Sequence, residues 1–390
     1  MKILLTTDLF LPAVNDIVTS VMNLRQALRE KGHEVRILTI SPIELSYFDN
    51  EVYYIGSMKH PIYQDRYAAF HLPSDSLKDI LSWAPEIVHS QCEFYTFNFA
   101  KTIAKKADIP LIHTHYLFMG NYSHYTWLPE QTREKALSHT LKNRLSKACK
   151  IIAPSQYVHD TLLEIVSAEK IVTIPLGIDL EKFKNGQDPE KTHLLREKLG
   201  IEQDCPVLIS IGRLMQEKNC EMLIKNMVSI VQWNAKVKLL FIGEGPMREK
   251  LEQLGYSLGI SENLIFTGMI TPSEISLYFQ IGTVFVTAST EDTLGITYRE
   301  ALASGLPVIC RKDYCLEKDI INGLNGYVFQ SETELTNTIK NILFDKELLK
   351  SLSTNAVLIS KRYALSEFGA SMEAVYLECI EQWQKKGIKS

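Results

Sequence analysis

Two basic side chains, Arg213 and Lys218, follow an apolar run over residues 207–211 that predicts a buried strand. Arginine presents forked donors to a phosphate, and lysine presents a compact positive charge. Gly212 precedes the arginine and permits a close approach of backbone to ligand. The pattern favours a diphosphate site, with a solvated arginine and lysine in a surface loop as the alternative.

A second stretch, residues 288–308, gathers three acids around a glycine. A polar loop carries Glu291, Asp292 and Gly295, and a short predicted helix carries Glu300. The free N–H groups at a helix N-terminus favour an anionic ligand. A carboxylate can accept hydrogen bonds from both hydroxyls of a ribose, a role open to Glu300. Any one of these acids, taken alone, is more typical of an ordinary solvated loop.

Two glycine turns follow further apolar runs in the same half of the chain. Gly243 opens the turn G-E-G-P, which lets a planar group approach, and T-G-M-I offers backbone groups at Met269 and Ile270 to a base edge. Ligands of open α/β sheets bind outside the carboxyl ends of the strands. Taken together, the four loops predict a site for a nucleoside diphosphate.

Two histidines, His113 and His115, lie at the end of a predicted strand over residues 109–113. Alternate residues of a strand share a face, so both imidazoles should point the same way. We predict no metal site, because no third ligand stands at a recognisable spacing. A ligand contact is the more plausible role, with a hydrogen-bonded structural histidine as the alternative.

Apolar runs alternate with helical periodicity along the chain, which predicts an α/β protein of two Rossmann-like, doubly wound parallel sheets that face a central cleft. We place the first domain at residues 1–180 and the second at 181–365, with the polar stretch 181–192 as the linker. The final helix, about 366–390, is expected to pack back on the first domain. Residues 53–75 predict a strand and a long loop. The remaining strands are predicted at 2–7, 34–40, 86–89, 150–154, 171–175, 238–242, 264–267, 284–286, 308–310 and 327–329.

The composition is that of an ordinary globular protein of 390 residues, with 45% hydrophobic and 23% charged residues. A net charge of −4 gives no general attraction to nucleic acid, which we do not expect as a partner. Seven cysteines without a C-x-x-C pair fit free thiols in a reducing cytoplasm. No apolar run is long enough to span a membrane, and the N-terminal run is too short for a signal peptide.

Residues 130–150 predict a basic amphipathic helix with six basic and two acidic residues and an apolar stripe at Leu137, Leu141 and Leu145. Such a helix can lie on an anionic membrane surface. The alternative is a stripe that packs on the domain beneath a solvated basic face. The candidates for membrane contact are Arg133, Lys142, Arg144 and Lys147.

In order along the chain, these motifs resemble the retaining glycosyltransferases of glycosyltransferase family 4, which have the GT-B fold. The resemblance rests on I-P-L-I-H-T-H (109–115), I-P-L-G-I-D (174–179), I-G-R-L-M-Q-E-K-N (211–219), G-E-G-P (243–246), F-T-G-M-I (266–270) and G-I-T-Y-R-E-A-L-A-S-G-L-P-V-I (295–309). The phrase T-S-V-M-N-L (19–24) is most similar to bacterial diacylglycerol glucosyltransferases, which use UDP-glucose at the membrane. The resemblance favours the membrane interpretation of residues 130–150.

The resemblance implies a role for each site residue. Arg213 and Lys218 would bind the donor diphosphate and stabilise the leaving UDP, so that neither a metal nor another cofactor is needed. His115 would lie on the sugar and acceptor side. The other implied contacts are Asp292 to the sugar hydroxyls, amides near Gly295 and Ile296 to the phosphate, Glu300 to the ribose, and Met269 and Ile270 to the uracil.

Two positions depart from the family pattern. The family has glutamate where Asp292 stands, so the site is shifted or Glu291 takes the role. It has glycine where Asp16 stands, and a carboxylate near a diphosphate weakens donor binding unless it points away. These departures keep open the alternative of a catalytically weak partner subunit of another transferase. A second alternative is a family 4 transferase with a non-glucose donor and a soluble or polymer-linked glycan acceptor.

The expectation is therefore a cytoplasmic hexosyltransferase with a UDP-sugar donor and a lipid or glycan acceptor. Attachment to the inner face of the cell membrane, through an anionic lipid surface, follows if the basic helix acts as the resemblance implies.

Overall fold

The computed structural model describes residues 1–13, 15–59, 67–116, 141–184, 188–290, 294–312 and 319–387. The chain forms two compact units, residues 1–177 with 365–390, and residues 178–364. The sequence places these boundaries three residues and one residue later, at 180 and 365. The functions expected of the two domains stay predictions.

Within the described residues, the first unit holds a sheet of eight strands in the order β10-β9-β8-β7-β1-β2-β4-β3. All neighbouring strands run parallel except β3, which pairs antiparallel with β4. The strands β5 and β6 pair antiparallel in a separate two-stranded sheet. The strands are β1 Lys2–Thr7, β2 Glu34–Ile40, β3 Tyr47–Asp49, β4 Val52–Ile55, β5 Met58–Lys59, β6 Tyr67–Ala68, β7 Ile87–Ser90, β8 Leu111–Thr114, β9 Ile151–Ala153 and β10 Ile171–Thr173.

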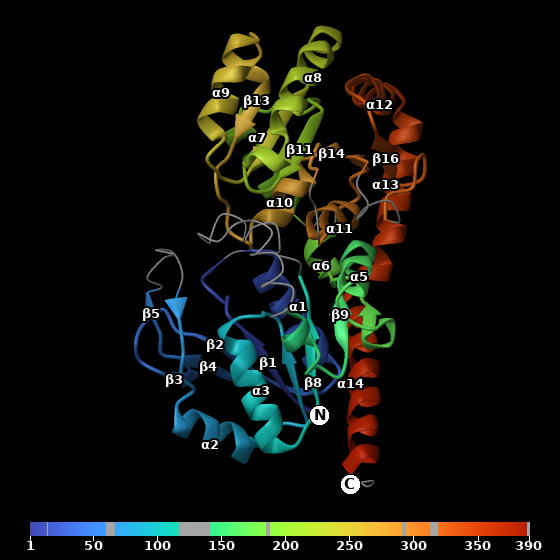
Figure 1. Cartoon of the computed structure of the whole chain (residues 1–390). Helices are drawn as coiled ribbons and strands as arrows, with labels where there is room; N and C mark the ends of the chain where they lie inside the picture. Colours follow the sequence, from blue (N-terminus) through green and yellow to red (C-terminus); the bar gives the residue numbers. More distant parts are fainter. Residues whose placement is uncertain are drawn as a thin grey trace. The chain divides into compact units, whose positions relative to one another are not determined.

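Helices of the first unit bury their apolar stripes against this sheet. The side chains of α2 and α3 share one core with β1, β2, β7 and β8. The helix α1 packs against β2 and against α14, the last helix of the chain (Figure 1, red). The packing of α14 on the first unit follows the sequence prediction. The bounds are α1 Asp16–Glu30, α2 Ser74–Trp83, α3 Tyr95–Ala107, α5 Gln156–Leu163, the 3₁₀ turn Ala168–Lys170, and α14 Leu365–Gly387.

The second unit holds a parallel sheet in the order β13-β12-β11-β14-β15-β16. Its strands alternate with helices, and α8 packs against both α9 and α12. The strands are β11 Val207–Ile211, β12 Lys238–Ile242, β13 Leu264–Phe266, β14 Val284–Thr287, β15 Val308–Arg311 and β16 Gly326–Phe329. The helices are α6 Leu180–Phe183, α7 Pro189–Lys198, α8 Cys220–Trp233, α9 Arg248–Ser257, α10 Ile275–Gln280, α11 Ile296–Ala303, α12 Glu332–Phe344 and α13 Lys346–Ser360, with 3₁₀ turns at Gln216–Lys218, Ser261–Asn263 and Lys361–Tyr363.

The prediction of a linker over residues 181–192 is wrong, because this polar stretch belongs to the second unit. It contains helix starts. The side chain of Asp188 accepts from the N–H of Lys191 at the start of α7, and Asp179, just before the stretch, accepts from the N–H of Lys182 at the start of α6. An aspartate followed by Pro189 is a typical helix start, so the stretch signals a helix rather than a free connection.

The helix predicted over residues 130–150 ends earlier than expected. Residues 130–140 lie outside the described residues, and the helical part that follows ends at Leu145. The N–H of Cys149 donates to the carbonyl of Leu111, next to the sheet, at 2.7 Å. A backbone bond that extends the sheet cannot also serve a helix, so the chain leaves the helix before it reaches β9.

A buried carboxylate, Asp8, joins the end of β1 to the start of α3. One oxygen accepts from the N–H of Thr96 at 2.8 Å, while the other has no hydrogen-bond partner among the described groups. Burial raises the pKa of Asp8 to about 6, although the bond from Thr96 lowers it. The folded protein therefore binds a proton at this site more tightly than the unfolded chain does.

Asp8→Asn should remove a pH-dependent loss of stability. Because the folded pKa lies above the unfolded one, wild-type stability falls as pH rises through the interval between them. The stability of the variant relative to wild type should rise between pH 4 and 7.5 by up to ~3 kcal/mol, since each pKa unit is ~1.36 kcal/mol. Urea denaturation across this range measures it.

Asp345→Asn is the matched control, because Asp345 is an exposed carboxylate that also caps a helix. This control should not show the rise. Parallel stability curves for wild type and Asp8→Asn would contradict the assignment.

Candidate nucleotide site

Two loops lie side by side at one edge of the second sheet. Strand β11 has β12 on one side and β14 on the other, so the strand order reverses direction here. The N–H of Thr290, after β14, donates to the carbonyl of Glu217, after β11, at 3.0 Å. Open α/β sheets bind ligands at such a switch point, outside the carboxyl ends of the strands.

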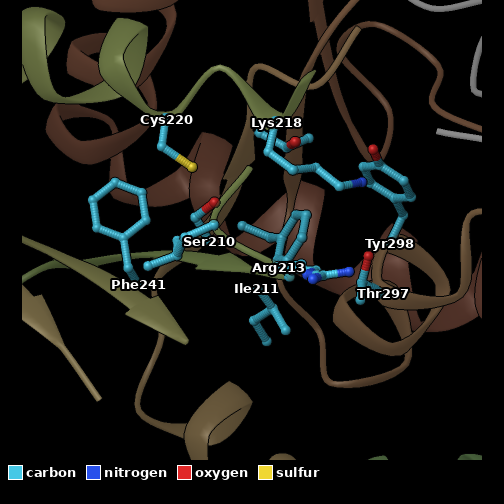
Figure 2. Close-up of a pocket in the computed structure, with 12 residues that line it drawn as sticks. Ser210, Ile211, Arg213, Lys218, Cys220, Phe241, Thr297 and Tyr298 are labelled. Atoms are coloured by element: carbon cyan, nitrogen blue, oxygen red, sulfur yellow. The ribbon is translucent and has the colours of Figure 1, made fainter. Parts of the chain in front are cut away.

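Arg213 and Lys218 extend from the β11 loop in the same direction. Arg213 is exposed, and Lys218 is half-buried with its stem passing beside Gly212. Figure 2 shows both side chains extending toward Thr297 and Tyr298, on the first turn of α11. The cavity that these residues line is only about 10 Å³, room for about one water. A nucleotide would therefore lie on the open rim and not inside this cavity.

The N-terminus of α11 completes this edge. Gly295, at φ 66°, adopts the left-handed conformation just before Ile296 and has no side chain that could cap the helix. The first N–H groups of the helix lie at the positive end of the helix dipole, which favours an anionic ligand. Glu300 lies one turn further along and is only 8% exposed.

A buried arginine fixes the start of α11. Arg299 donates to the carbonyl of Leu294 at 3.1 Å and to Asp319 Oδ2 at 3.1 and 3.3 Å. Its guanidinium also lies over the ring of Tyr363, 4.7 Å from the centroid. This side chain therefore holds the residue next to Gly295 in place, which makes it a positioning residue for the loop.

The predicted glycine turns serve backbone packing. A Cβ on Gly243 would lie 2.1 Å from the carbonyl oxygen of Gly212, so only glycine fits there. The N–H of Gly243 donates to the carbonyl of Gly268 at 3.0 Å. Gly243 thus meets neighbouring backbone rather than open space for a planar group. Beyond Gly268, Met269 is exposed and Ile270 is half-buried.

The predicted site residues divide into three groups. Arg213, Lys218, Gly295, Ile296 and Glu300 lie at the same edge of one sheet, and their binding roles stay predictions. Glu291 and Asp292 lie outside the described residues, as does Arg133. Asp16 is the first residue of α1 in the other unit, where an acid in the first helical turn is favoured by the dipole.

A second polar cluster lies at the ends of β7 and β8, beside the switch point of the first sheet between β1 and β7. Glu93, in the loop after β7, places Oε1 2.6 Å from His115 Nδ1 and 3.5 Å from His113 Nε2. The two imidazoles therefore point to the same face of the sheet, as the alternation of side chains along a strand predicts. Burial raises the pKa of Glu93, but the imidazoles outweigh burial and hold it well below its usual range. Burial lowers the pKa of His113.

Sequence reasoning missed Glu93 and Arg299. Glu93 follows a predicted strand that lies beside the strand of His113, so their shared sheet edge was a usable signal. The partner of Arg299 is Asp319, which lies 20 residues away in the chain. No local sequence pattern predicts this pair.

The basic segment is only partly as expected. Lys142 and Lys147 are exposed, while Arg144 donates to the backbone carbonyl of Glu93 and so supports the polar cluster. The membrane contact expected of these residues stays a prediction. Leu141 and Leu145 are buried in a core with neighbouring residues of the first unit. For these two leucines the packing alternative is the correct one, while Leu137 lies outside the described residues.

Arg299→Met should destabilise the protein by about 3–5 kcal/mol, because it leaves the poorly exposed carboxylate of Asp319 without its buried partner. Arg362→Met is the matched control: Arg362 approaches the same carboxylate at 3.8 Å from a position that is 46% exposed. It should cost about 1 kcal/mol or less. Chemical denaturation measures both, and equal losses would show that Arg299 does not anchor the loop.

No helix among the described residues is long and apolar enough to cross a membrane.

Residues 17–182 match the family model for Glycosyltransferase Family 4, and residues 191–358 match that for Glycosyl transferases group 1. The two models together take in both units of the fold.

Two curated relatives are similar over nearly the whole chain. The alpha-monoglucosyldiacylglycerol synthase of Streptococcus pneumoniae is 32% identical over 385 residues, covering 97% of this chain and 86% of the relative. The enzyme of the same name from Acholeplasma laidlawii is 30% identical over 397 residues, covering 99% of each. Among solved structures, Anabaena Alr3699/HepE in complex with UDP and glucose superposes with a TM-score of 0.75 at 17% identity, covering 97% of this chain and all of that one. The chain therefore belongs to glycosyltransferase family 4 and has the GT-B fold, built from two doubly wound α/β domains.

Proposed function

We propose that this glycosyltransferase moves a glucosyl group from UDP-glucose to diacylglycerol, with retention of the anomeric configuration. The observation that carries the proposal is the convergence of Arg213 and Lys218 on the N-terminus of α11. These groups present fixed positive charge where a departing diphosphate gains negative charge. The names of the two relatives at 30% and 32% identity support the choice of sugar and acceptor.

The donor is proposed to bind along the edge of the second sheet. Glu300 would hold the ribose hydroxyls, and the backbone at Met269 and Ile270 would meet the uracil. The amides near Gly295 and Ile296 would meet the phosphates. Contacts to the sugar hydroxyls would come from Asp292 or its neighbour Glu291, and His115 would lie on the sugar side.

Transfer with retention is proposed to occur on one face of the sugar. The bond between the anomeric carbon and the phosphate oxygen breaks, and the acceptor hydroxyl oxygen bonds to the same carbon from the same face. The departing phosphate oxygen takes the hydroxyl proton. The two cations and the helix N-terminus supply positive charge to the leaving group, so this proposal does not require a metal.

Arg213→Ala and Lys218→Ala should each weaken UDP binding at least tenfold and reduce transfer by about a hundredfold or more, because each removes a charge-assisted contact to the diphosphate. Calorimetry measures UDP binding. Mass spectrometry detects hexose transfer from UDP-glucose to diacylglycerol in vesicles.

Lys225→Ala is the matched control, because Lys225 is an exposed cation on α8 of the same unit. It should behave as wild type. If the wild-type protein binds no UDP at millimolar concentration, the proposal of a UDP-sugar donor is refuted. Transfer to soluble glycans but not to diacylglycerol would refute the proposed acceptor and leave the proposed donor unaffected.

Attachment to an anionic membrane is the second part of the proposal, and it rests on Lys142 and Lys147, which are exposed. Lys142→Gln with Lys147→Gln should weaken binding to vesicles rich in anionic lipid by about 2 kcal/mol, or roughly thirtyfold, at ~1 kcal/mol per charge. Vesicle sedimentation measures it. The pair Lys105→Gln with Lys106→Gln, exposed on α3, is the control. Binding that ignores both lipid charge and salt would contradict the electrostatic attachment.

A further inference from the structure

We infer that Glu93, His113 and His115 form a binding site for Zn²⁺ or a similar divalent transition metal in the first unit. One ligand atom from each of these side chains lies within 4.8 Å of the others. The sequence predicts no metal here, because Glu93 comes from a different strand than the histidine pair. The fold supplies the third ligand that local spacing does not.

The donor set fits a borderline metal. Two imidazole nitrogens and one carboxylate oxygen are typical of zinc and related ions, whereas calcium and magnesium prefer oxygen ligands alone. Tetrahedral zinc with bonds of about 2.0–2.2 Å places its donor atoms about 3.3–3.5 Å apart. The separation of 3.5 Å between Glu93 Oε1 and His113 Nε2 matches this spacing. The separation of 2.6 Å between Glu93 Oε1 and His115 Nδ1 must open by less than about 1 Å.

The cluster is also poorly satisfied without an additional partner. His113 is fully buried, and its Nε2 approaches Glu93 Oε1 at 3.5 Å, a separation that is long for a hydrogen bond. A buried imidazole in this state is costly, and a bound cation would satisfy the nitrogen that faces Glu93. Arg144 donates to the backbone carbonyl of Glu93 and so fixes the loop that supplies the carboxylate. Metal sites rely on such supporting contacts.

Three protein ligands leave one coordination position for water or another small ligand. Because the metal would bind Nδ1 of His115, a bound metal should fix this imidazole and prevent it from turning to contact a sugar. Zinc would then inhibit glycosyl transfer. This last consequence rests on the proposed function, whereas the binding site itself does not.

Titration of the full chain with Zn²⁺, after removal of adventitious metal and in competition with a chromophoric chelator, tests the site. Wild type should bind one Zn²⁺ that Glu93→Gln and His115→Asn each weaken at least tenfold. Glu93→Asp keeps a carboxylate and should fall between wild type and Glu93→Gln. His33→Asn is the matched control, because His33 lies 2.8 Å from Glu373 with no second histidine in that pair.

Two further measurements separate the outcomes. Co²⁺ in place of zinc should give visible d–d absorption without an intense thiolate charge-transfer band, and such a band would assign the metal to cysteine and overturn the site. Circular dichroism without metal checks that the variants fold. No wild-type binding at about 100 μM free Zn²⁺, or unchanged binding in Glu93→Gln and His115→Asn, overturns the proposal. A bound zinc that leaves transfer unaffected overturns only the inhibition, and a chain that binds zinc but transfers no sugar refutes the proposed function alone.

Discussion

The site of the second unit depends on backbone packed against backbone. A Cβ on Gly243 would come within 2.1 Å of the Gly212 carbonyl oxygen, and one on Gly245 within 2.3 Å of the Leu214 carbonyl oxygen. The loops after β11 and β12 therefore interlock, and the N–H of Leu214 donates to the carbonyl of Glu244 at 2.9 Å. Because this contact admits no side chains, it sets where the β11 loop turns. The direction in which Arg213 leaves that loop follows from it.

A rigid loop solves the main difficulty of an exposed cation, which is its conformational freedom. Arginine and lysine side chains lose much rotamer entropy when a ligand orders them. A fixed backbone on one side and a fixed start of α11 on the other limit this cost, because both ends of the proposed contact are already in place. Arg299 contributes on the α11 side through its bonds to Leu294 and Asp319. The buried charge of Arg299 thus serves to position the loop.

Sequence patterns predicted the positions of the strands along the chain well and the long-range pairs of side chains poorly. Apolar runs located β1, β2, β11 and β12 because each strand is buried on both faces and its run has clear ends. Residues 181–192 were misread because capping residues and linker residues have the same composition, and only the D-P pair distinguished them. The Glu93 cluster and the Arg299 pair depend on which strands lie side by side, and no single stretch of sequence contains that information.

The two units place different chemistry at neighbouring positions of their sheet edges. At the switch point of the second sheet, Arg213, Lys218 and the N-terminus of α11 suit an anion. Beside the switch point of the first sheet, the carboxylate of Glu93 and two imidazoles suit proton or metal chemistry. Parallel sheets impose the position, because all their strands end at one edge, but they impose nothing on the side chains there. Under the proposed function, the second unit would stabilise the leaving group, and the first would meet the sugar and acceptor. The proposed zinc site is compatible with that division, since imidazole and carboxylate groups that could meet a sugar hydroxyl are also of the types that bind zinc.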